Sequence, residues 1–296
     1  MTAAGVPGKA GYSGVPPGSG EDCPGPGDEP WRTRPGTPMI GPYSVHQMDD
    51  FYAALAVGQV RPSGIMNYLQ RLYIAERCPP GARVVDVCCG RGLQLPVLYR
   101  YAPHLRRYVG LDISTDNLTQ ARERVARLDE VYGGSPFPID LYEQDVAATW
   151  TNDLGSFDVA VYTSALEHLP VEPARVSLRH VAQHLAPGGR LFLSTPNTTG
   201  PSPRPLQHRV HVYEWNTEEL LPVLADCGLR VRSQVGLLPP EPDLLAQALA
   251  DRYGAGAATW YRDMVSTVPA ALLDALSATT VPDVAAEVLY VCERPA

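Results

Sequence analysis

Short strand-like runs, either apolar or alternating, are separated by longer amphipathic stretches over most of the chain. The strand-like runs lie at 84–87, 108–111, 139–143, 157–162, 191–194, 229–235 and 287–292. After the second of these runs, apolar side chains recur at the spacing of a helix that lies on a sheet, at Leu118, Ala121, Val125 and Leu128. Strands and helices that alternate in this way predict an α/β domain built on a parallel sheet.

The chain changes character before the first predicted strand. Residues 1–42 are rich in Pro, Gly and Ser and carry few large apolar side chains, so we expect them to be disordered. Residues 43–80 have a helical pattern that is interrupted near Gly58 and Pro62, and we interpret them as a helical cap. Residues 81–296 then form the core.

A long segment separates the last two predicted strands. Within residues 239–284, the pattern predicts helices over 243–253 and 259–276. An insertion at this place lies near the carboxyl ends of the strands, where open α/β sheets bind ligands. The segment is therefore a candidate lid over an acceptor or a candidate dimer contact.

The first predicted strand leads into a glycine-rich turn, Val-Val-Asp-Val-Cys-Cys-Gly-Arg-Gly over 84–92, and the second strand ends on Asp112. Glycine lets a backbone approach a ligand that a Cβ would block. An acid at the second strand end can accept hydroxyl protons from a ribose. These features predict a nucleotide-cofactor site. Because Leu95 stands where a dinucleotide fingerprint has its third glycine, a nicotinamide-dependent oxidoreductase is the weaker alternative.

The turn resembles motif I of the class I S-adenosylmethionine-dependent methyltransferases. Asp86, Gly90 and Gly92 stand on its key positions, and Cys88 stands where the family usually has a first glycine. The resemblance continues in register over 84–235 and extends to ubiquinone-biosynthesis-like and antibiotic-tailoring small-molecule methyltransferases. It implies a Rossmann-like, seven-stranded, mostly parallel sheet with an antiparallel last strand, preceded by N-terminal helices. The helical insertion that the pattern predicts between strands 6 and 7 departs from the family, which usually has a short turn there.

The resemblance implies S-adenosyl-L-methionine as the cofactor. Asp112 falls on the ribose-binding acid, and Asp145 falls where the family's acid meets the adenine amino group. The implied cofactor-binding residues are Asp86, Cys88, Gly90, Gly92, Asp112, Ile113, Asp145, Val146 and Ser164. We expect Asp112 to accept both ribose hydroxyls, and we expect deletion of residues 1–38 to leave cofactor binding unchanged.

Methyl transfer needs an acceptor atom aligned with the sulfonium carbon and, for a hydroxyl or an ammonium, a base. Glu167 and His168 follow the fourth strand and are the catalytic candidates. An imidazole with the unperturbed pKa of about 6.5 suits a base at neutral pH, although His168 could equally pack on the cofactor. Glu167 would act if the acceptor atom were carbon. Further candidates, for which packing or solvent roles are favoured, are His208, His211 and Tyr213.

Composition and charge restrict the classes of partner that we expect for this chain. The formal net charge is −8, which argues against a nucleic-acid partner because such binding needs clustered cations. No apolar run is long enough to span a membrane, and the start lacks the apolar core of a signal peptide. The six cysteines form no C-x-x-C pair, so we expect no metal site and reduced thiols in the cytoplasm.

The sequence thus predicts a methyltransferase that acts on a small molecule in specialised, natural-product metabolism, with a homodimer as a possible assembly. The acceptor atom, O, N or C, stays open. The alternatives are a cofactor-binding protein without transferase activity, whose insertion fills the acceptor pocket, and the oxidoreductase.

Overall fold

The computed structural model describes residues 58, 62–150, 154–200 and 203–296, and these contain one seven-stranded sheet in the order β3-β2-β1-β4-β5-β7-β6. The first five strands pair in parallel, and β7 is antiparallel to both β5 and β6. The predicted fold class is confirmed. The strands are β1 Arg83–Val87, β2 Arg107–Asp112, β3 Ile139–Glu143, β4 Phe157–Thr163, β5 Leu185–Pro196, β6 Arg230–Leu238 and β7 Glu287–Glu293.

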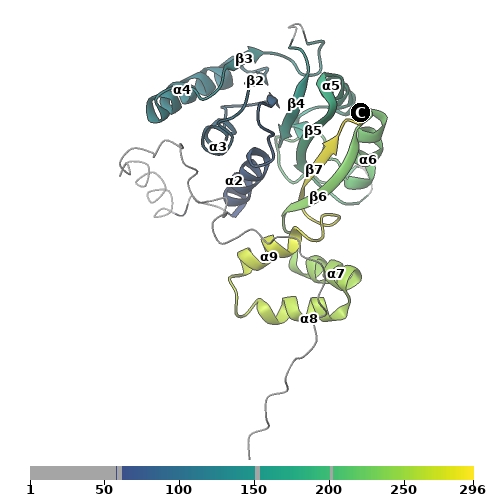
Figure 1. Cartoon of the computed structure of the whole chain (residues 1–296). Coiled ribbons are helices and arrows are strands. Elements are labelled where there is room, and N and C mark those ends of the chain that lie inside the picture. Colours follow the sequence, from purple (N-terminus) through teal and green to yellow (C-terminus); the bar gives the residue numbers. More distant parts are fainter. Residues whose placement is uncertain (1–57, 59–61, 151–153, 201–202) are drawn as a thin grey trace, which may run out of the picture. The chain divides into compact units, whose positions relative to one another are not determined.

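Helices cover both faces of this sheet (Figure 1). One apolar core joins the sheet to α2, α3 and α4, and the other joins it to α5 and α6. The helices of the two layers are α2 Pro62–Ala75, α3 Leu95–Tyr101, α4 Thr115–Tyr132, α5 Val171–His184 and α6 Thr217–Asp226. The helix predicted from the apolar spacing of Leu118 to Leu128 extends to Tyr132, and Gly133, with a φ of 75°, ends it.

The topology places the predicted site residues at one edge. From β1 the chain builds β2 and β3 on one side and then β4 and β5 on the other side, so the order reverses between β1 and β4. Open α/β sheets bind ligands beyond the carboxyl ends of the strands at such a switch point. Asp86, Asp112 and Thr163 stand at or near the carboxyl ends of β1, β2 and β4.

Three helices fill the segment between β6 and β7, namely α7 Pro242–Tyr253, α8 Ala255–Met264 and α9 Ala270–Ala278. They share a small apolar core of their own, and α9 also packs against β6. The prediction of a single helix over 259–276 is wrong, because this stretch belongs to two helices, α8 and α9. Pro269 caps α9, and a proline disfavours helical geometry in the residue before it and donates no backbone hydrogen bond.

Several expectations lie outside the described residues, among them the disordered tail over 1–42 and the part of the helical cap before Pro62. Within the described part of the chain, no helix combines the length and the apolar character needed to cross a bilayer.

Candidate functional site

The turn between β1 and α3 contains three residues in the left-handed region, with φ of 55° at Cys88, 55° at Gly90 and 70° at Gly92. A Cβ on Gly90 would meet nothing within 4 Å, so the backbone there borders open space that a ligand could fill. A Cβ on Gly92 would lie 2.9 Å from Leu95 Cδ1 and 3.4 Å from the Cβ of Ala121. Gly90 is therefore the glycine that a cofactor can approach, whereas Gly92 lets α3 and α4 pack closely.

Cys88 adopts a backbone conformation that favours glycine, and its side chain packs against the core. A non-glycine residue in the left-handed region costs about 1–2 kcal/mol. Burial raises the pKa of the Cys88 thiol to about 12, which keeps it protonated and argues against a redox role. The turn thus carries strain that the family's usual glycine avoids.

We expect Cys88→Gly to keep the free energy of unfolding within about 1 kcal/mol of the wild type, because relief of this strain offsets the lost packing and the greater freedom of the unfolded chain. Cys88→Val should cost about 2 kcal/mol more than Cys88→Gly, because a β-branched side chain tolerates positive φ poorly. Urea unfolding of the three proteins measures both effects. Equal stability of the Gly and Val variants would contradict the strain argument.

Asp112 holds the turn to the end of β2. Its Oδ2 accepts a hydrogen bond from the Gly90 N–H at 2.8 Å, and its Oδ1 accepts from the Ser114 N–H at 2.9 Å and from Asn117 Nδ2 at 3.2 Å. The residue is only 6% exposed. A carboxylate has about four lone-pair sites, so three donors leave one for a ligand. A second ligand hydroxyl would have to replace a donor, and the Asn117 amide makes the longest of the three bonds.

The other predicted cofactor residues surround this edge in different ways. Ile113 is 67% exposed and presents an apolar surface just past β2. Asp145 is exposed, and its Oδ1 accepts from the Ala147 N–H at 2.9 Å. The side chain of Val146 is buried in the core, so only its backbone is placed to meet a ligand. The Ser164 hydroxyl donates to Glu287 Oε1 at 3.1 Å.

Asp86 is buried at the carboxyl end of β1. Its Oδ2 accepts a hydrogen bond from the Tyr108 hydroxyl at 2.7 Å. Burial raises the pKa of Asp86 to about 7, although the Tyr108 hydrogen bond and the charge of Arg71 lower it. Arg71 is a residue that the sequence analysis missed. It lies on α2, its charge interacts with Asp86 and Glu287, and its carbonyl accepts from Gln94 Nε2 at 3.1 Å.

The raised pKa of Asp86 predicts that the free energy of unfolding depends on pH. A carboxyl group with a pKa near 3.9 in the unfolded chain and about 7 in the folded protein favours folding below about pH 4, and this contribution disappears as the pH rises through 7. The quantity to compare is the free energy of unfolding of Asp86→Asn minus that of the wild type. We expect this difference to increase by roughly 2–4 kcal/mol between pH 4 and pH 8, because only the wild type loses stability over this range. Urea unfolding across this range measures the difference. Parallel curves would show that Asp86 titrates normally.

The second half of the site follows β4, in a short 3-10 turn at Leu166–His168. Glu167 is 2% exposed, and its Oε2 accepts from the Thr195 hydroxyl at 3.1 Å. Burial raises the pKa of Glu167 to about 7, and the charges of Glu287 and Glu214 raise it further. His168 is exposed, and its Nδ1 lies 3.2 Å from the Val210 carbonyl oxygen.

The loop before α6 is fixed to this turn by backbone hydrogen bonds. The Glu167 carbonyl accepts from the Val212 N–H at 2.8 Å and from the Tyr213 N–H at 3.2 Å. His211 is thereby placed with its ring centroid 5.2 Å from that of His168, and its Nδ1 bonds to Glu214, which is 1% exposed. Of the described groups, Glu167, His168 and His211 each place one ligand atom within 4.8 Å of the others, which is close enough to hold a metal ion.

Sequence reasoning placed Glu167 and His168 correctly after β4, but it missed Glu214 and Glu287. Glu287 opens β7 and is buried with its Oε1 accepting from Ser194 at 3.2 Å. The signal for it was an acid at the start of an otherwise apolar strand. No pattern along the chain points to Glu214, because only the folded loop brings it to its partner His211.

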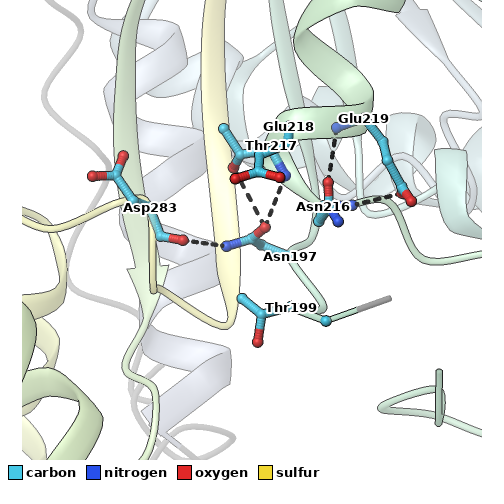
Figure 2. Close-up of a pocket in the computed structure, with 8 residues that line it drawn as sticks. Asn197, Thr199, Asn216, Thr217, Glu218, Glu219 and Asp283 are labelled. Carbon is cyan, nitrogen blue, oxygen red and sulfur yellow. Dashed lines mark hydrogen bonds between the residues drawn. The ribbon is translucent and has the colours of Figure 1, made fainter. Parts of the chain in front are cut away.

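A separate pocket of about 390 Å³ lies where β5 ends and α6 begins (Figure 2). The Asn197 side chain bridges its two sides, with Nδ2 donating to the Asp283 carbonyl at 3.1 Å and Oδ1 accepting from the Thr217 N–H at 3.0 Å. Asn216 and Glu219 form the capping box of α6 beside it. None of the predicted cofactor or catalytic residues lines this pocket.

Comparisons with known proteins identify the family of the chain. A family model described as a methyltransferase domain matches residues 61–234. A ubiquinone biosynthesis O-methyltransferase of Xanthomonas axonopodis pv. citri (strain 306) is 35% identical over 162 residues, which cover 52% of this chain and 63% of that relative. The matched part is thus less than two thirds of the relative's length.

Two solved structures share the fold. The [4+2]-cyclase SpnF is 20% identical with a TM-score of 0.52, over 77% of this chain and 81% of that chain. The N-methyltransferase NodS from Bradyrhizobium japonicum WM9, in complex with S-adenosyl-l-homocysteine, is 15% identical with a TM-score of 0.50, over 80% of this chain and 89% of that chain. At these identities the similarity describes the fold alone.

Proposed function

Because the chain belongs to the methyltransferase domain family, in the class I S-adenosylmethionine-dependent group, we propose that it transfers a methyl group from S-adenosyl-L-methionine to a small-molecule acceptor. The observation that carries the proposal is the bond between the Gly90 N–H and the Asp112 carboxylate. It joins the turn that a ligand can approach to the acid that can hold a ribose, at the switch point of the sheet.

In this proposal, the cofactor lies over the carboxyl ends of β1, β2 and β4. Asp112 accepts the ribose hydroxyls, one at its free lone pair and one in place of the Asn117 amide. Ile113 packs on the adenine ring, since its side chain is exposed and apolar. The Asp145 side chain and the Val146 backbone face the adenine edge. Arg71 binds the carboxylate of the methionine part, because its charge lies near Asp86 at the turn.

The acceptor side of the site is formed by Glu167 and His168. The cofactor supplies an electrophilic methyl group, so the protein has to align the acceptor, exclude water and take up a proton. With His168 Nδ1 facing the Val210 carbonyl, the Nε2 lone pair is free to accept a hydroxyl proton. The buried Glu167 would serve instead if the acceptor atom were carbon.

We propose oxygen as the acceptor atom, because the sequence relative is named an O-methyltransferase. That relative is also named for ubiquinone biosynthesis, whereas the sequence of this chain predicts natural-product metabolism. Small hydroxylated molecules of both kinds therefore belong in an acceptor screen.

Calorimetric titration with S-adenosylhomocysteine and, separately, with NADH tests the cofactor. We expect saturable binding of S-adenosylhomocysteine at micromolar concentration or tighter and none of NADH. A screen for release of S-adenosylhomocysteine in the presence of hydroxyl, amine and activated carbon acceptors then tests turnover. Binding without turnover of any acceptor would support the inactive cofactor-binding alternative, and binding of NADH alone would overturn the proposal.

A further inference from the structure

Two histidines and a buried carboxylate come together beside the proposed acceptor side of the site. His168 stands 42 positions before Val210, the neighbour of His211. Glu167, His168 and His211 each offer a ligand atom, and these atoms lie within 4.8 Å of one another. The rings of His168 and His211 meet edge to face. Two imidazoles and one carboxylate are a ligand set that leaves coordination positions open on a divalent transition-metal ion.

In both imidazoles, Nδ1 has a hydrogen-bond partner, which leaves Nε2 as the atom that can bind a metal ion. His168 Nδ1 faces the Val210 carbonyl, which can only accept, so Nδ1 carries the proton and Nε2 keeps its lone pair. His211 Nδ1 bonds to Glu214. A carboxylate or carbonyl behind the far nitrogen is the arrangement that orients metal-binding histidines and raises their basicity.

The carboxylate of Glu167, the third ligand, is also held in place by hydrogen bonds. Glu167 is almost completely buried, and the Thr195 hydroxyl donates to its Oε2. Its carbonyl oxygen accepts two N–H groups of the loop that carries His211, so the spacing between the ligands is set by backbone hydrogen bonds. Glu214 and Glu287 are also buried in this neighbourhood, and their charges act on Glu167. This excess of buried carboxylates favours a bound cation.

We propose that Glu167, His168 and His211 bind a divalent transition-metal ion, such as Zn²⁺, Fe²⁺ or Co²⁺, whose open positions face the methyl acceptor. The sequence predicts no metal site, because its six cysteines form no C-x-x-C pair and have no histidine partner at zinc spacing. Ligands that are distant in the sequence leave no such pattern.

The role of the ion in catalysis rests on the proposed function. A hydroxyl oxygen of the acceptor binds the ion, which lowers the pKa of that hydroxyl and lets its proton leave to solvent. The oxygen then attacks the methyl carbon as the carbon–sulfur bond breaks, giving a methyl ether and S-adenosylhomocysteine. His168 is a ligand in the ion-bound enzyme, and its general-base role belongs to the enzyme without the ion.

Binding of Co²⁺ to the full chain, after treatment with a chelator and dialysis, tests the site. The visible absorption of Co²⁺ reports its ligands, and calorimetry gives the affinity. We expect one saturable site in the wild type, and azide should change its spectrum by binding at an open position. The double variant His168→Ala/His211→Ala should weaken Co²⁺ binding at least a hundredfold, and Glu214→Gln should weaken it about tenfold to a hundredfold.

His184→Ala is the matched control. His180 and His184 stand four residues apart on α5, and the Nδ1 of each faces a backbone carbonyl, so this pair is the competing place for a divalent ion. We expect His184→Ala to bind Co²⁺ like the wild type. The inference is overturned if wild-type protein shows no saturable Co²⁺ binding, or if His184→Ala loses binding that the double variant keeps.

The outcomes also separate this inference from the proposed function. Protein that binds S-adenosylhomocysteine but no Co²⁺ would keep the proposed function and lose the metal site. Protein that binds Co²⁺ through His168 and His211 but no S-adenosylhomocysteine would keep the site and lose the proposed function. Circular dichroism of each variant confirms that a lost signal does not come from unfolding.

Discussion

His168→Ala is expected to lower kcat by roughly 10² to 10⁴ while leaving the affinity for S-adenosylhomocysteine within a few fold. The imidazole follows β4 on the proposed acceptor side, whereas Gly90 and Asp112 are the groups that we propose to hold the cofactor. Its loss removes a group needed in the transition state, whether it acts as a base or as a metal ligand. Steady-state kinetics with the acceptor found in the screen, together with calorimetry, measure both quantities.

The pH profile and added metal distinguish the two roles. If a histidine base limits the rate, the rate rises with pH as the imidazole loses its proton, and His168→Ala should lose that limb of the profile. If the histidine is a ligand, millimolar Co²⁺ should restore part of the activity of His168→Ala. His104→Ala is the control. His104 is an exposed histidine that precedes β2, and its Nε2 bonds to the Cys78 carbonyl oxygen. Weaker cofactor binding with unchanged kcat would make His168 a packing residue.

Asp112→Ala is expected to weaken S-adenosylhomocysteine binding about ten- to a hundredfold, or on the order of 1.5 to 3 kcal/mol. The ribose hydroxyls would lose their charged acceptor, and the Gly90 N–H would lose the bond that fixes the turn. Asp112→Asn should lose less, because one acceptor oxygen remains. Calorimetric titration measures the affinities, and the thermal unfolding midpoint shows how much of the loss comes from the turn itself.

Asp116→Ala provides the matched control for Asp112. Asp116 is an exposed acid in the first turn of α4, four residues further along the chain, and its carboxylate accepts from the Gln120 side chain. Removal of the Asp116 carboxylate lowers the local negative charge as much as removal of the Asp112 carboxylate does. It should leave the affinity for S-adenosylhomocysteine unchanged. Equal losses in Asp112→Ala and Asp116→Ala would show that charge, rather than a direct bond to the ribose, is responsible.

Periodicity predicted the strands because each is short and apolar or alternating, and burial inside the sheet requires that pattern. The strand at Ile139–Glu143 was predicted with its observed bounds. Helix α3 begins only at Leu95, since the residues before it belong to the glycine-rich turn. The prediction of one helix over 259–276 is wrong because the apolar pattern continues past Pro269, whereas a continuous helical backbone does not.

The sequence by itself determined the fold class, the glycine-rich turn, and the places of Asp86, Asp112, Glu167 and His168 at strand ends, because these follow from local pattern and chain order. Only the tertiary structure decided which groups meet. The backbone bonds from Val212 and Tyr213 to Glu167 bring His211 to His168, and the folding of α2 over the turn brings Arg71 near Asp86. Such contacts depend on where a loop or a helix packs, and the periodicity of one segment contains no information about its partner.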